Sequence, residues 1–102
     1  MLFSDFKNHL STKISASLLW EYDLNNFDYQ DTKALVVQRV IERGRMYDFY
    51  AMLNLYGLEE TKNTIKKIKC LNKKDMNFVN VVFEIPFIEL RCYTEQQVTK
   101  NF

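Results

Sequence analysis

The sequence predicts an all-α domain, a compact bundle of about five short helices. Apolar residues make up 47% of the 102 residues and aromatics 15%, enough for a hydrophobic core without disulfides. Only two glycines and one proline occur, whereas a β-sandwich would need many turn residues. The length fits one domain, and we expect residues 1–102 to form it, with a polar tail from about residue 99.

The first long helix is expected to begin after Asp28, a plausible N-cap, and to end at Gly44 in a left-handed C-cap. Its apolar residues recur at helical spacing, whereas Leu35 falls on the polar side. Upstream, residues 18–23 are expected to form a helical turn that packs Leu19 and Trp20 onto the core. The expected buried face of the long helix is Ala34, Val37, Val40 and Ile41.

Residues 46–56 predict a second helix that is apolar on nearly every side, since only Asp48 and Asn54 are strictly polar. Such a helix is either central in the core or covered by a partner protein, and both interpretations stay open. In a domain this small, burial on three sides is hard to arrange. The candidate partner contacts are apolar residues off the core stripe of their helices: Leu35, Tyr47, Met52 and Leu55.

Gly57 is expected to turn the chain into a third helix, residues 58–69, so that residues 46–69 outline a helix-turn-helix-like hairpin around Gly57. Six lysines and no acidic residue lie between Thr61 and Lys74. They could contact phosphates, or they could form a solvated face that complements the helix dipole. The expected helix start, Glu59, is acidic and argues against base readout. The candidate nucleic-acid contacts are Lys62, Asn63, Lys66, Lys67, Lys69, Lys73 and Lys74.

Asn72 can cap a fourth helix that reaches about residue 83 and ends before Pro86. A strand is the competing interpretation of residues 78–85, because several of these residues are β-branched. Further on, residues 94–97 have the pattern of a capping box that opens a last turn.

No catalytic, metal or cofactor pattern is recognisable. His9 is the single histidine, and the spacing of Asp23, Asp28 and Asp31 fits no metal-binding loop. Cys70 and Cys92 stand apart and are expected to be reduced thiols. A formal net charge of +1 gives no global signal for nucleic acid. We therefore expect a non-enzymatic cytoplasmic protein with no cofactor and no membrane segment.

Several short motifs occur together: LLWEYD at 18–23, FDY at 27–29, RVIERG at 39–44, LYG at 55–57 and RCY at 91–93. Their combination resembles a family of small, poorly characterised proteins common in the Bacteroidetes and often encoded beside nucleotidyltransferase-type toxins of the abortive-infection class. The resemblance extends over about residues 17–97. Arg45 and Tyr47 depart from it, because members often have Asp or Trp after the glycine. It implies an antitoxin-like or accessory partner of such a toxin.

The function we expect is a protein-binding module, with a toxin encoded nearby as its protein partner. A neutralising partner needs no active site but an apolar, aromatic face with charges at its rim. A DNA-binding regulator that uses the Gly57 hairpin is the first alternative. A structural or oligomerisation domain, for example a homodimer, is the second.

Overall fold

The computed structural model describes residues 2–94, and these form four α-helices and four short 3-10 helices, with no strand among them. Residues 91–94 are also helical, where the described part ends. The predicted all-α fold is confirmed. In chain order the elements are η1 (Phe6–Asn8), η2 (Ala16–Leu19), η3 (Leu24–Asn26), α1 (Lys33–Arg43), α2 (Met46–Tyr56), α3 (Leu58–Lys67), α4 (Lys73–Val82) and η4 (Phe87–Glu89).

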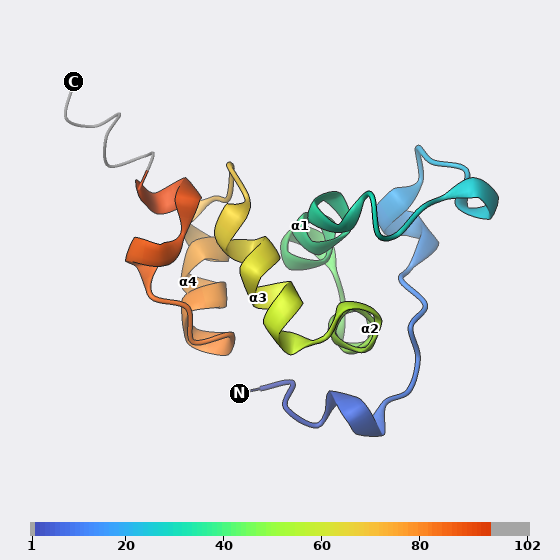
Figure 1. The fold of residues 1–102 in the computed structure, drawn as a ribbon, viewed down its shortest axis with the longest axis horizontal. Helices are drawn as coiled ribbons and strands as arrows, with labels where there is room; N and C mark the ends of the chain where they lie inside the picture. Colours follow the sequence, from blue (N-terminus) through green and yellow to red (C-terminus); the bar gives the residue numbers. More distant parts are fainter. Residues whose placement is uncertain (1, 95–102) are drawn as a thin grey trace.

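The helices lie side by side in a flat arrangement (Figure 1), in which α3 contacts both α1 and α2, and α1 also reaches α4. The domain measures 45 × 30 × 19 Å. A helix with its side chains is about 10 Å across, so the domain is roughly two helices thick. The N-terminal segment, blue in Figure 1, passes beneath α2 and rises along one side to η2. A domain this thin leaves few positions where a helix is covered on all sides by other helices.

The two glycines serve different purposes. Gly57, between α2 and α3, has φ 84° and ψ 157°, a conformation that L side chains rarely adopt, so the expected corner is confirmed. Gly44 has φ −69° and ψ 152°, and the expected left-handed cap is therefore wrong. Space explains this glycine, because a Cβ added there would lie 2.5 Å from the carbonyl oxygen of Val40.

The first long helix begins later than expected, at Lys33, with Thr32 as its N-cap. Asp28 instead closes the turn before it, accepting from the backbone N–H of Gln30 (2.9 Å) and Asp31 (3.1 Å). These bonds hold the pKa of the Asp28 carboxyl below its usual value. The buried face also differs from the expected one. Ala34 is exposed, and the buried residues of α1 are Val36, Val37, Val40 and Ile41.

The helical interpretation of residues 73–83 is correct through Val82, and the strand alternative is wrong. Asn72 caps α4 as expected, its side-chain oxygen accepting from the N–H of Asp75 at 2.8 Å. The asparagine cap and the core-facing valine Val79 outweigh the β-branched composition. At the far end, Thr94 is already helical instead of opening a turn. The rest of that capping box, and the expected polar tail, lie outside the described residues.

The core draws on every α-helix and on the C-terminal turns. The thiol of Cys92 is buried, and its Sγ lies 2.9 Å from the backbone nitrogen and 3.2 Å from the carbonyl oxygen of Leu71. Cys70 is exposed, and neither cysteine is in a disulfide. Fully buried side chains include Leu19, Val37, Leu53, Ile65, Val79 and Leu90.

Candidate protein-interaction surfaces

The four side chains expected to contact a partner do not share one exposed surface. Met52 is completely buried in the core, so its assignment as a partner contact is wrong. Leu35 and Leu55 are half-buried, and only Tyr47 is open to solvent, at 54% exposure. Helical spacing did not predict the buried face of α2, which is a broad arc that includes Ala51 and Met52, whereas Met46 is 60% exposed.

The chain itself covers much of the remaining surface of α2. Residues 3–15, which we call the strap, run across the outer side of this helix. Both polar residues of α2 hold the strap by its backbone. The carboxylate of Asp48, 1% exposed, accepts from the N–H of Ser15 at 2.8 Å and of Arg45 at 3.0 Å. The amide nitrogen of Asn54 lies 2.9 Å from the carbonyl oxygen of Phe6. Of the two interpretations left open for this helix, cover within the monomer accounts for much of its surface.

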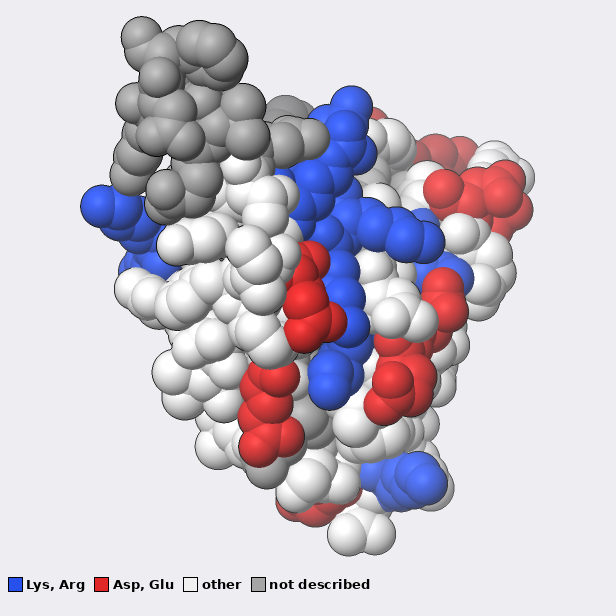
Figure 2. All heavy atoms as spheres, turned by 60° about the vertical axis from the view of Figure 1, so that its left-hand side comes forward, with Lys and Arg blue, Asp and Glu red and all other residues white. Residues whose placement is uncertain are grey.

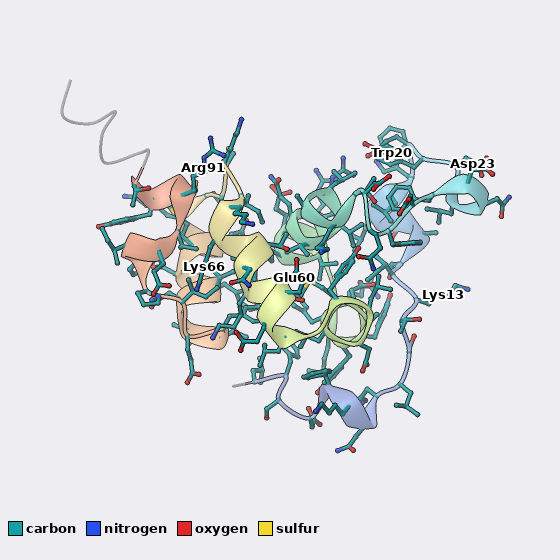
Figure 3. The ribbon with its side chains drawn as sticks, in the orientation of Figure 1. Lys13, Trp20, Asp23, Glu60, Lys66 and Arg91 are labelled. Atoms are coloured by element: carbon teal, nitrogen blue, oxygen red, sulfur yellow. The ribbon has the colours of Figure 1, made fainter. Side chains whose placement is uncertain are left out.

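The largest correction concerns Trp20, which is 75% exposed instead of packed on the core. Its neighbours Leu18 and Leu19 are buried, so the short η2 turn is anchored while the indole faces solvent. Figure 3 shows Trp20 at the edge of the domain, beyond α1. Tyr22, two residues further on, is also exposed, at 42%. Three consecutive apolar residues on one turn cannot all face the core, a signal that the sequence already carried.

Arg39 of α1 fixes the turn that carries Trp20. Its Nη1 donates to the carbonyl oxygen of Leu18 at 2.9 Å, and its Nη2 lies 2.6 Å from an oxygen of Glu21. The hydrogen bond from Arg39 lowers the pKa of the Glu21 carboxyl. The turn is therefore tied to α1 on both sides of Trp20.

Ring contacts continue from this turn toward the core. Tyr22 meets Phe27 edge-on at 5.4 Å between centroids, and Phe27 meets Tyr29 at 4.8 Å. Tyr56 of α2 donates its hydroxyl to the carbonyl oxygen of Tyr29 at 2.7 Å. Burial raises the pKa of Tyr56, which keeps this hydroxyl protonated as a donor. Tyr22 is therefore connected through Phe27 and Tyr29 to α2.

Figure 2 shows Lys and Arg side chains in a narrow stripe with acidic side chains on both sides of it, and a second basic group apart from the stripe. The lysines proposed for nucleic-acid contact belong to α3, to the residues that follow it and to the start of α4. Lys66 is half-buried and pairs with Glu89 at 2.9 Å. At the start of α3, Glu60 pairs with Lys33 at 2.7 Å, which lowers the pKa of the Glu60 carboxyl. Lys62 is half-buried as well, and the exposed members of the set are Asn63, Lys67, Lys69, Lys73 and Lys74.

Neither a metal-binding cluster nor a membrane span occurs among the described residues. Among residues 2–94, no group of three or more His, Cys, Asp or Glu side chains could hold a metal ion. Nor does any helix there have the length and apolarity needed to span a bilayer. His9 is exposed and lies 3.2 Å from Asp5, and both residues contact Tyr50 of α2.

A comparison with protein families gives one match, a family of unknown function (DUF6922), over residues 14–65. No curated protein and no solved structure matches the chain. The matched range contains η2, the Trp20 turn, α1, α2 and most of α3. Four of the five motifs quoted above lie within it, and the RCY motif at 91–93 lies beyond it.

Proposed function

The chain belongs to the family of unknown function DUF6922, and on that premise we propose that it is a non-enzymatic protein-binding module that contacts its partner through Trp20 and Tyr22. One observation carries the proposal. The single tryptophan is 75% exposed on a turn whose flanking residues are anchored, and this turn lies inside the family-matched range. Large aromatic residues on rigid supports are typical centres of protein interfaces.

The energy available at this position is large for one residue. A tryptophan buries on the order of 200 Å² when fully covered. Covering the exposed three-quarters at about 25 cal/mol per Å² would contribute roughly 4 kcal/mol. Because Arg39 already holds the turn through Leu18 and Glu21, the backbone of the turn loses little conformational entropy on binding.

The partner that we propose is a nucleotidyltransferase-type toxin encoded beside this chain, with the chain in an antitoxin-like or accessory role. The sequence resemblance supports this partner through genetic neighbourhood. A neutralising protein acts by occupying its partner's surface, which is consistent with an exposed aromatic site and with the absence of a metal-binding cluster among the described residues.

Co-expression with the product of the adjacent gene, followed by affinity capture, tests the proposal. Trp20→Ser should abolish capture while the helical circular dichroism signal stays unchanged. Val81→Ser is the matched control, because this apolar side chain of α4 is 74% exposed on a different element. Equal capture by both variants, or no capture by the native chain, would contradict the proposal.

DNA binding is the second candidate, favoured by the basic stripe in Figure 2. Fluorescence anisotropy with a random-sequence duplex at low salt tests it. Binding at micromolar protein that weakens steeply with salt, and that is lost when the exposed Lys67 and Lys69 are changed to Gln, would support it. No binding under these conditions would remove it.

A further inference from the structure

An aromatic ring anchors the strap to α2. The side chain of Phe3 is 3% exposed, and its ring lies parallel to that of Phe49 with 4.8 Å between centroids. Tyr50 meets the same ring edge-on at 5.5 Å. Phe3 thus occupies a pocket made by two successive aromatic residues of α2, as an anchor residue does in a protein interface.

A carboxylate follows the anchor two residues later. The Asp5 carboxylate accepts from the Tyr50 hydroxyl at 2.9 Å, and this bond holds the pKa of Asp5 low and raises that of Tyr50. His9 stacks on the same Tyr50 ring at 3.9 Å between centroids. Tyr50 therefore recognises an acidic residue with its hydroxyl and a planar residue with its face.

The remaining contacts recognise the strap's backbone. The amide nitrogen of Asn54 lies within hydrogen-bond distance of the carbonyl oxygens of Phe6, His9 and Ser11. At the other end, buried Asp48 accepts the N–H of Ser15. Backbone contacts of this kind do not depend on side-chain identity, so another extended segment could make them equally well.

Apolar side chains at the strap differ in burial, and Ile14 near its C-terminal end is 2% exposed and belongs to the core. Leu2, just before the strap, and Leu10 within it are 61% and 82% exposed. A hollow of about 900 Å³ separates the strap from the corner between α2 and α3. Its walls include Phe6 and Lys7 of the strap and Tyr56, Gly57, Leu58 and Glu59 of the corner.

The receiving groups and the strap also differ in family coverage. Asp48, Phe49, Tyr50 and Asn54 all lie within the matched residues 14–65, whereas residues 2–13 lie outside them. The family match therefore covers the receiving groups but only the last two residues of the strap.

We propose that this face of α2 is a peptide-binding site that the strap closes in cis, and that a partner protein opens it with a segment of the same chemistry. The partner's segment is extended and carries an aromatic side chain followed two residues later by a carboxylate. The proposal rests on the protein-binding function above but places a second contact far along the chain from Trp20. Its occupant is defined by the strap itself, whose contacts with α2 show what the site accepts.

Competition between the strap and the partner sets the behaviour of the intact chain. A tethered segment competes at an effective concentration on the order of millimolar, so a free peptide binds the intact chain only weakly. Cutting the tether removes this advantage. The exposed residues 11–13 are the place to cut, because none of their side chains is buried. Lys13 lies along the outer edge of the domain in Figure 3.

The test inserts a specific protease site within residues 11–13 of the full chain, cleaves it, and adds a fluorescein-labelled peptide of residues 1–12. We expect the cleaved strap to stay bound through gel filtration, the helical signal to persist, and the labelled peptide to exchange into the site. A Phe3→Ala peptide should bind on the order of ten-fold more weakly or worse, since it loses a buried ring. A Leu10→Ala peptide, changed at an exposed apolar residue, should bind normally.

Three results would overturn the proposal. Unfolding on cleavage would make the strap an integral part of the core. Equal exchange of the Phe3→Ala and Leu10→Ala peptides would show that the site does not select an aromatic anchor. A dimer of the uncut chain with exchanged straps would make a second copy the occupant. The peptide assay contains no partner protein, so a negative result there does not contradict partner binding through Trp20. Equally, a negative result in the Trp20→Ser capture assay does not contradict peptide exchange.

Discussion

The buried carboxylate of Asp48 offers the sharpest test of how the strap and α2 are joined. Each of its oxygens accepts one backbone N–H, from Ser15 and from Arg45. Asp48→Ala leaves both donors without their acceptor, and each loss costs about 1–3 kcal/mol. We expect the variant to be destabilised by about 2–4 kcal/mol, which lowers the melting temperature by roughly 10–20 °C in a domain of this size.

Urea denaturation followed by circular dichroism measures this loss, and limited trypsin digestion reports on the strap. Cleavage at Lys13 should accelerate, because Ser15 has lost its partner on α2. The control is Glu42→Ala, which removes an exposed carboxylate from α1 and should change the free energy of unfolding by less than about 0.5 kcal/mol. If Asp48→Ala and Glu42→Ala unfold at the same urea concentration, the carboxylate of Asp48 does not hold the strap and the reasoning fails.

Three further predictions follow from the corners and from the Trp20 turn. Gly57→Ala should cost about 1–3 kcal/mol in urea denaturation through backbone strain alone, because a Cβ there would meet no atom within 4 Å. Gly44→Ala should cost about 1–3 kcal/mol by overpacking, since its Cβ would press against Val40. Adding Val40→Ala should not fully restore the lost stability, because the atom nearest to the new Cβ is the backbone carbonyl oxygen of Val40. Arg39 lowers the folded-state pKa of Glu21 below its usual 4.5, so the stabilising contact is present above that pH and is lost as the pH falls through the folded value. The fluorescence of Trp20, the single tryptophan, should therefore change in acid in the native chain, and Glu21→Gln should already show the acid-like signal at neutral pH; a flat native titration would refute this.

Local rules predicted the central elements well. The bounds of α2 match the expected 46–56, because its apolar run is closed on the C-terminal side by Gly57, a residue that readily adopts positive φ. Asn72 and the start of α4 follow from a side-chain cap that acts within three residues. Where a signal is contained in a few neighbouring residues, as at these two positions, the sequence was enough to locate the element.

The candidate site was harder to predict, because it depends on contacts between distant segments. Asp48 stood out as the only carboxylate on α2, but its partner Ser15 lies 33 residues away. Trp20 was expected in the core from its hydrophobicity, yet Arg39, 21 residues from Leu18, orients the turn so that the indole faces outward. Helical spacing fixes the direction of a side chain from its own axis and cannot say which segment will cover it.

The flatness of the domain connects these observations. A layer about two helices thick cannot cover a helix that is apolar on nearly every side, and α2 is such a helix. Residues 3–15 supply the missing cover with two buried side chains, Phe3 and Ile14, and with bonds to Asp48, Tyr50 and Asn54. A cover attached at so few points costs less to displace than a packed helix would. The same thinness that forces the chain to cover its own α2 also leaves that cover replaceable by a partner.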